Sequence, residues 1–281
     1  VLPAAGFGRP LLPATKAQPK EMLPIVDKPV IQDIVEEAVA SGIEQIVIIT
    51  GQSKRSIEDH FDYPFELAHR LRSQRKEEEL REVERISELA NFVYVRQQQP
   101  LGNGHAVLMA KDVIGDEPFA VLWGDDLVDA EVPCLRQFIR VYERYGASVM
   151  GVMKVPRESI SKYGVIAAKP VGERAHEVLD LVEKPTQESA PSDLAAVHGF
   201  VLTPQIFDAL ENTPPGKGGE IWLSDAIKLL MASQKVYALE FEGKRYDAGN
   251  KLEFLQATVD VALKRPTLAH AFLTYFKALA P

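Results

Sequence analysis

Short apolar runs alternate with segments of helical periodicity along most of this chain of 281 residues. In residues 30–42 the apolar side chains recur at helical spacing, and Gly42 is a suitable stop. The next apolar run, at 45–50, is short and uninterrupted, which is typical of a buried strand in a parallel sheet. The alternation predicts a layered α/β fold with a largely parallel sheet.

The same patterns predict further elements. Residues 66–90 are dense in charged side chains and are expected to form one or two solvated helices that extend from the body. Thr203 and Pro204 are suitable as the N-cap and first residue of a helix. Further strands are predicted at 92–96, 118–124, 147–155, 163–168, 177–183 and 194–202, and further helices at 104–114, 132–145, 251–264 and 267–279.

Composition and charge limit the classes of function. At 46% hydrophobic and 26% charged residues, the chain resembles an ordinary globular protein with a sizeable core. Its net charge of −8 would repel nucleic acid and anionic membranes, so neither is expected as a partner. No signal peptide is visible, and no apolar run reaches the roughly 18 residues that span a bilayer. A polyanionic substrate would need a local cluster of Lys or Arg and the help of a metal ion.

The single cysteine, Cys134, cannot form an internal disulfide and fits a reducing, cytoplasmic compartment. It lies on the apolar face of a predicted helix, where we expect it to pack in the core. Because the sequence opens directly on VLPAAG, we expect its first strand to be truncated. No repeat, low-complexity stretch or linker is apparent, so one domain over residues 1–281 is predicted, or two intimately packed halves.

The first loop, at residues 3–21, combines small residues with lysines. Glycine there lets the backbone approach a ligand closely, and exposed N–H groups can bind phosphate oxygens. Lys16 and Lys20 both lie within 14 residues of Gly6. Leu11 stands where the last glycine of the dinucleotide fingerprint G-x-G-x-x-G would fall, and the GK[ST] ending of a P-loop is missing. The loop therefore predicts a phosphate site of another kind.

A pair of carboxylates, Asp125 and Asp126, directly follows the apolar run PFAVL. Strand ends of this kind are where α/β sheets bind ligands. An acidic pair after a strand can instead cap the next element, and this alternative weighs more for Asp126 than for Asp125.

Nine motifs in one order extend over nearly the whole chain: PAAGFG, LPATKAQPKEMLPIVDKPVIQ, RQQQPLGNGHAV, GDD, SKYGVI, LVEKP, VLTPQIF, GGEIWLSDAI and FEGKRYDAGNK. This set resembles the bacterial UTP–glucose-1-phosphate uridylyltransferase (UDP-glucose pyrophosphorylase) family. The resemblance implies a three-layer, Rossmann-like nucleotidyltransferase fold with a mixed, mainly parallel central sheet. It also implies Mg²⁺ dependence, a homodimer or homotetramer, and a cytoplasmic role in carbohydrate metabolism. The implied reaction joins the uridylyl group of UTP to glucose 1-phosphate, forming UDP-glucose and pyrophosphate.

The resemblance further assigns parts of the chain and single residues. Residues 1–155 would bind the nucleotide, 156–250 the sugar, and 251–281 would form C-terminal helices. Nucleotide binding falls to Ala4, Ala5, Gly6, Glu21, Gln97 and Gly102. Sugar binding falls to Gly164, Glu183, Lys184 and Glu220. The catalytic candidates are Lys20, Arg9, Asp125 and Lys184, and Asp125 and Asp247 would bind Mg²⁺.

Physical chemistry favours these residue types for that reaction. The two substrates bring about six negative charges together, which a divalent ion between carboxylates and well-placed lysines can offset. Glucose 1-phosphate is already an anion, so its oxygen needs no general base. No Ser–His–Asp set is apparent, and His105 is expected to be structural. Catalysis would be alignment and charge stabilisation of an in-line displacement.

The chain departs from the family pattern in its first loop. The family continues G-x-G-T-R, whereas Pro10 stands here at the place of the catalytic arginine and the only guanidinium is that of Arg9. Either Arg9 takes over, or the sequence skips one residue of this loop. Alternatively, the chain is a catalytically attenuated regulatory homologue that binds UDP-glucose. A sister nucleotidyltransferase for another nucleotide or sugar phosphate is a further alternative.

Two milder departures concern the second half of the chain. Trp222 replaces a glutamine beside the predicted sugar site, where it can alter the selectivity for glucose. Asn250 replaces the usual aspartate of the family and is expected to be the N-cap of the C-terminal helices.

Overall fold

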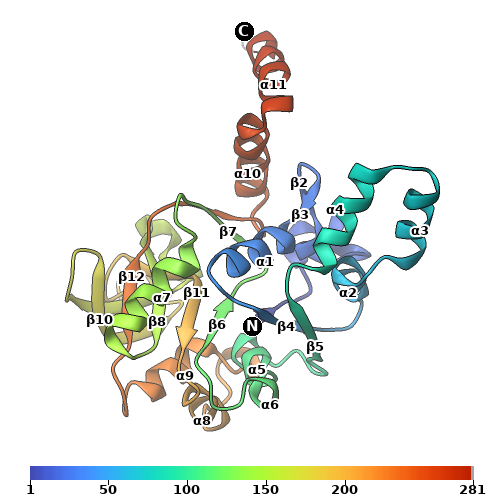
Figure 1. Cartoon of the computed structure of the whole chain (residues 1–281). Helices are drawn as coiled ribbons and strands as arrows, with labels where there is room; N and C mark the ends of the chain where they lie inside the picture. The colour runs from blue at the N-terminus through green and yellow to red at the C-terminus, as the bar shows by residue number, and fades with distance from the viewer. Residues whose placement is uncertain (280–281) are drawn as a thin grey trace.

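A twisted central sheet forms the middle of the computed structural model, which describes residues 1–279 apart from the side chain of Lys217 (Figure 1). In spatial order its strands are β5 (Asn91–Arg96), β4 (Gln45–Thr50), β1 (Leu2–Pro3), β6 (Phe119–Leu122), β11 (Leu194–Leu202), β8 (Val149–Lys154) and β12 (Tyr237–Glu240). Val1 joins β1 to β6, because its N donates to Ala120 O (2.7 Å) and its carbonyl accepts from Leu122 N (3.1 Å). Only β11 runs against the others, so the predicted mixed, mainly parallel sheet is confirmed.

Antiparallel pairs of strands adjoin this sheet. A hairpin of β9 (Gly164–Pro170) and β10 (Ala175–Glu183) continues it, with β10 against β12 and the start of β9 against β11. Strand β13 (Lys244–Asp247) pairs with β7 (Asp126–Asp129), which places residue 247 opposite residue 126. A small hairpin of β2 (Pro24–Ile25) and β3 (Lys28–Pro29) lies near the C-terminal helices.

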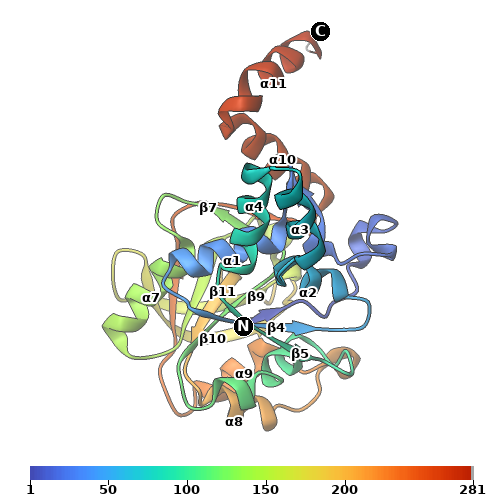
Figure 2. The ribbon, with the colours of Figure 1, turned by 45° about the vertical axis from the view of Figure 1, so that its right-hand side comes forward.

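Helices cover both faces of the sheet and complete three layers (Figures 1 and 2). One face is covered by α1 (Val30–Ala40), α2 (Arg55–Phe61) and α7 (Cys134–Tyr145), the other by α5 (Asn103–Leu108), α6 (Lys111–Ile114), α8 (Ile206–Glu211) and α9 (Leu223–Leu230). Val35 and Phe138 are fully buried on the first face, and Val107 and Ile227 on the second. Cys134 is also fully buried, as predicted.

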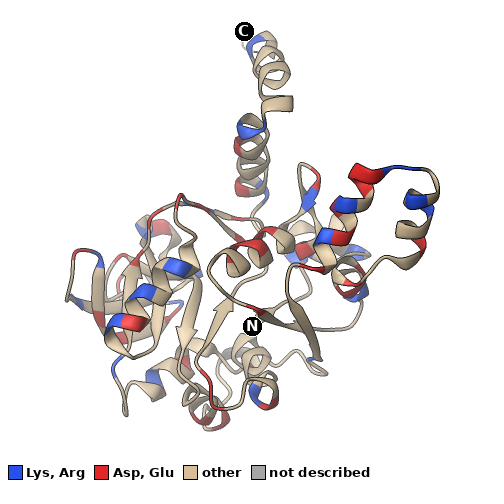
Figure 3. Ribbon diagram, viewed as in Figure 1, with Lys and Arg blue, Asp and Glu red and all other residues tan. Residues whose placement is uncertain are grey.

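Two peripheral pairs of helices project from the body. The pair α3 (Phe65–Ser73) and α4 (Glu77–Ser87) carries many charged residues, which agrees with the prediction for residues 66–90 (Figure 3). At the C-terminal end, α10 (Lys251–Lys264) and α11 (Pro266–Leu279) extend away from the sheet (Figure 2). Asn250 Oδ1 accepts from Leu252 N (3.0 Å), so the predicted N-cap of α10 is confirmed.

Two predicted helices differ in the structure. The helix predicted at 104–114 is divided into α5 and α6, because Ala110 N bonds to Val107 O, only three residues back. The helix expected from Thr203 begins at Ile206 instead. The Thr203 hydroxyl is held by the Gln234 side chain (2.9 Å) rather than capping that helix.

The sheet interleaves strands from both predicted halves of the chain. Strand β11, from the predicted sugar-binding half, lies between β6 and β8 of the nucleotide-binding half. A boundary near residue 155 therefore does not divide the sheet, and the organisation as one domain stays a prediction. Within the described residues, no helix combines the length and apolarity needed to cross a bilayer.

Candidate active site

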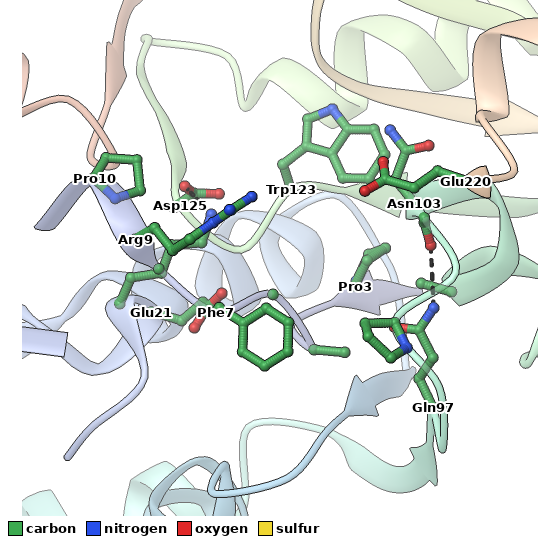
Figure 4. A pocket seen from close by; sticks show the side chains of 17 residues that line it. Pro3, Phe7, Arg9, Pro10, Glu21, Gln97, Asn103, Trp123, Asp125 and Glu220 are labelled. Carbon is green, nitrogen blue, oxygen red and sulfur yellow. Dashed lines mark hydrogen bonds and ion pairs between the residues drawn. The ribbon is translucent and has the colours of Figure 1, made fainter. Parts of the chain in front are cut away.

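An open pocket of about 1200 Å³ lies at the carboxyl ends of β1, β5 and β6 (Figure 4). Residues predicted to bind or act on the nucleotide line much of it: Ala5, Gly6, Arg9, Lys20, Glu21, Gln97, Gly102 and Asp125, together with Glu220. Ala4 is instead fully buried below the pocket, where its N–H donates to Ile49 O (2.9 Å). Four further predicted residues lie outside the lining: Gly164, Glu183, Lys184 and Asp247.

The Gln97 amide is held with a defined orientation. Its Nε2 lies 3.1 Å from Gly102 O and 2.9 Å from His105 Nδ1. Burial lowers the pKa of His105, which favours a neutral ring whose Nδ1 accepts from the amide. His105 therefore has the structural role that was predicted. With both Nε2 hydrogens engaged, Gln97 presents Oε1 as an acceptor.

Gly102 allows two loops of the pocket wall to lie against each other. Its φ is 105°, and a Cβ there would lie 2.5 Å from Ile221 O. Ile221 N donates to Leu101 O (2.7 Å), and Leu223 N donates to Asn103 Oδ1 (3.0 Å). Asn103 thus fixes the start of α9 beside the pocket.

The first loop is folded into a short 3-10 helix, Arg9–Leu11. Gly8, with a φ of 62°, precedes it, and the Thr15 hydroxyl donates to Gly8 O (2.7 Å). Pro10 fits there because the first turn of a helix needs no N–H donor. The Arg9 side chain extends into the pocket on the side of Asp125 (Figure 4).

Charged side chains gather where this loop meets the end of β6. Lys20 forms an ion pair with Asp125. Burial lowers the pKa of Lys20, but Asp125 and Glu21 outweigh it and hold that pKa above its ordinary value. Glu21 is itself buried and accepts from Lys54 Nζ (2.9 Å). Its carboxylate therefore provides negative charge beside both Lys54 and Lys20.

The second predicted metal ligand, Asp247, lies next to Asp125. A Cβ on Gly249 would lie 2.9 Å from Asp125 Oδ2 and 3.0 Å from Asp247 Oδ1, so these oxygens lie within about 6 Å of each other. Burial raises the pKa of Asp247, and the charge of Asp125 raises it further. Two carboxylates that repel each other beside a glycine are a donor set that a hard divalent cation fits.

The predicted sugar residues meet at the junction of β9 and β10. Glu183 pairs with Gly164 across these strands, and a Cβ on Gly164 would lie 3.2 Å from Glu183 Oε2. The same oxygen accepts from the Ser224 hydroxyl (2.8 Å). Lys184 follows with a φ of 44°, and its ammonium lies 3.8 Å from the centre of the Trp222 ring. Trp222 is two residues from Glu220, so this group adjoins the pocket.

A buried network below the pocket was not predicted from the sequence. Asp126 is buried and forms an ion pair with Arg245 (Nε–Oδ1 2.6 Å), so its carboxylate is directed away from the pocket. His198, Lys54 and the pocket-lining Trp123 were also missed. The sequence signal for His198 is a polar residue inside the otherwise apolar run LAAVHGFVL.

The arrangement suits an anionic ligand that carries a planar, hydrogen-bonding ring. Gln97 and two tightly packed loops form one wall, while Arg9 and Lys20 bring positive charge to the other. Asp125 and Asp247 bring two carboxylates together beside Gly249, a donor set that a divalent cation would fit. Such a site can bind a nucleoside triphosphate and align a second phosphate with it.

Comparisons with known proteins agree with this geometry. Residues 1–264 match the sequence model described as nucleotidyl transferase. A UTP–glucose-1-phosphate uridylyltransferase of Bacillus subtilis (strain 168), YngB, is 52% identical over 277 residues, which cover 99% of this chain and 93% of that protein.

Solved structures are similar as well. A UTP-bound UGPase from Acinetobacter baumannii matches with a TM-score of 0.92 and 40% identity, covering 99% of this chain and 98% of that one. A UDP-glucose pyrophosphorylase complexed with UDP-glucose matches with a TM-score of 0.86 and 44% identity, over 94% of this chain and 98% of that one. This chain belongs to the nucleotidyl transferase family.

Proposed function

We propose that this protein transfers the uridylyl group of UTP to glucose 1-phosphate and releases pyrophosphate, with UDP-glucose as the product. The observation that carries the proposal is the cluster of Lys20, Asp125 and Asp247 beside a pocket that also presents Gln97. Relatives of similar length that are 50 to 52% identical bear the name of this activity.

For the nucleotide, we place uracil between Gln97 and the backbone of residues 5, 6 and 102, with Ala4 buried below them. Uracil N3–H would donate to Gln97 Oε1, the acceptor left free by the bonds of Nε2. Backbone N–H groups of the glycine-containing loops would donate to the two uracil carbonyls. A purine is larger than the ring this slot is proposed to hold, so selectivity for a pyrimidine follows.

For the metal, we propose Mg²⁺ held by Asp125 and Asp247. When bound, Mg²⁺ supplies positive charge and Lewis acidity at the phosphate oxygens. Arg9 and Lys20 would hold the triphosphate, while Lys184 would hold the phosphate of the sugar. These residues would align the sugar phosphate oxygen with the α-phosphorus for in-line attack, which forms the new P–O bond as the bond to pyrophosphate breaks.

For the sugar, Glu183 would accept hydrogen bonds from glucose hydroxyls. Its Oε2 is already fixed by Ser224, so the carboxylate has a defined direction. Gly164, opposite Glu183, and Glu220, at the pocket wall, would complete the sugar site.

Trp222 is expected to support the binding of glucose 1-phosphate through Lys184. Replacing it with leucine removes the aromatic face under the ammonium and is expected to raise KM for glucose 1-phosphate about three- to tenfold. Replacement with tyrosine keeps an aromatic face and should give a smaller change. Steady-state kinetics with each substrate varied in turn tests this. An equal rise in KM for UTP would contradict a role confined to the sugar side.

A substrate panel tests the proposed function. We expect UTP with glucose 1-phosphate to give UDP-glucose, identified by mass spectrometry, at a higher kcat/KM than dTTP or another sugar 1-phosphate. A clear preference for another pair would make the chain a sister transferase. Binding of UDP-glucose without turnover of any pair would support the regulatory alternative, which the position of Pro10 favours.

We propose a cytoplasmic homo-oligomer as the setting of this activity. Helix α11 supports the oligomer, because it projects from the body with Leu273, Tyr275 and Phe276 exposed. Exposed apolar side chains gathered on one helix are typical of a contact surface. A single buried thiol, Cys134, agrees with a reducing compartment.

A further inference from the structure

His198 lies in the middle of β11 in an unusual backbone conformation. It is fully buried, and its φ is 65°, in the left-handed region that few residues other than glycine adopt. The register of β11 against β8 shifts between Ala196 and Phe200, around this residue. A strained conformation at a buried position persists only where surrounding contacts hold it.

Three of those contacts go to the segment 123–126, which contains the acidic pair. His198 N donates to Asp126 Oδ2 (2.8 Å), and ring Nδ1 lies 2.9 Å from Asp126 O. His198 O accepts from Trp123 N (3.1 Å). Backbone and ring together therefore fix residues 123 and 126, which flank Asp125 on both sides.

The other ring nitrogen is fixed by α1. Nε2 lies 2.9 Å from Glu37 Oε1, and that carboxylate oxygen also accepts from Leu135 N (2.8 Å) at the start of α7. The Asp126 carbonyl can only accept, so Nδ1 carries a proton. Burial lowers the pKa of His198, but Glu37 and Asp126 outweigh it, so a ring protonated on both nitrogens is favoured.

The same network reaches the second carboxylate. Asp126 forms an ion pair with Arg245, and β13 continues from Arg245 to Asp247. Strands β7 and β13 pair residue 126 with residue 247. Asp126 therefore connects the segment that carries Asp125 to strand β13, which carries Asp247.

We propose that His198 is a positioning residue for the proposed metal site, holding the segment 123–126 so that Asp125 faces Asp247. The proposal deepens the proposed function and rests on it. His198 itself touches neither substrate, because it is buried behind the segment that carries Asp125. Residues that orient ligands in this way commonly affect metal affinity and activity about 10- to 100-fold.

The test replaces His198 with asparagine, which tolerates a positive φ and keeps the two backbone bonds. We expect kcat to fall about tenfold and the Mg²⁺ concentration for half-maximal activity to rise about tenfold. The control is Phe138→Leu, a buried neighbour whose ring lies 6.0 Å from that of His198. It should lower Tm but leave the Mg²⁺ dependence unchanged. Unchanged Mg²⁺ dependence in His198→Asn, or the same change in Phe138→Leu, would overturn the proposal.

A second pair of variants keeps the test valid if His198→Asn does not fold. Glu37→Gln can still bond to Nε2, whereas Glu37→Leu cannot, so only the leucine variant should need more Mg²⁺. Equal Mg²⁺ dependence in the two would contradict the proposal. If the wild type transfers no uridylyl group, the proposed function fails first. The inference is then decided by Mn²⁺ binding in the presence of UTP, measured by electron paramagnetic resonance, which should weaken about tenfold in His198→Asn.

Discussion

Replacing Asp125 with asparagine is expected to lower kcat about 10²- to 10³-fold, the largest effect of any single substitution considered. Asparagine keeps the shape of the side chain but removes one of two charges proposed to bind Mg²⁺. It also leaves Lys20 without its ion-pair partner at the pocket. Asp247→Asn should have a similar effect, because its carboxylate approaches the same point beside Gly249. Pyrophosphate release measured over a range of Mg²⁺ concentrations tests both variants.

Asp129→Asn is the matched control for these two variants. Asp129 lies on β7, four residues after Asp125, and pairs with Lys264 on α10. Because this ion pair is exposed, its loss should leave kcat within about twofold of the wild type. Near-normal rates in Asp125→Asn and Asp247→Asn, with unchanged Mg²⁺ dependence, would show that the metal assignment is wrong.

Replacing Arg9 with glutamine is expected to lower kcat about 10²-fold, because a well-placed cation in such a site contributes on this scale. Arg9 lines the pocket on the side of Asp125, and Pro10 stands where the resemblance to the family predicts the catalytic arginine. If Arg9 has taken over the arginine role, its loss should affect kcat more than the affinity for glucose 1-phosphate. Steady-state kinetics of the variant measures both.

Arg55→Gln serves as the control, since Arg55 is exposed on α2 and pairs with Asp59 across one helical turn. We expect it to behave as the wild type. If Arg9→Gln also behaves as the wild type, Arg9 does not replace the family arginine. A gain of activity in Pro10→Arg would then indicate that the natural loop is attenuated.

Much of the order of strands and helices could be predicted because it depends on local patterns, although α2, α9 and β12 were not predicted. The run at 45–50 and the periodicity of 30–42 formed β4 and α1 close to their predicted bounds. The prediction that Thr203 is a helix N-cap was wrong, because its hydroxyl bonds to the side chain of Gln234, 31 residues further along the chain. A threonine at this position can cap a helix, but in the folded chain its hydroxyl makes a tertiary hydrogen bond instead.

The candidate site could be predicted only in part. Its pocket residues come from loops at strand ends, so a parallel sheet brings them together once the order of strands is known. The buried side chains that hold these pocket residues in place bond to partners far away in the sequence, so sequence spacing does not reveal them. Glu21 with Lys54, and Asp126 with Arg245 and His198, are separated by 33 to 119 residues and meet only in the folded chain. The pair Asp125 and Asp126 shows that adjacent residues of the same type can have different surroundings: Asp125 faces the pocket, whereas Asp126 is buried.

The turnover number with UTP, glucose 1-phosphate and Mg²⁺ tests the central claim most directly. We expect pyrophosphate release at a kcat within about tenfold of 10 s⁻¹, the median for enzymes. Release should stop when Mg²⁺ is chelated. A protein that binds UDP-glucose yet releases no pyrophosphate from these substrates would show that the proposed transfer reaction is wrong.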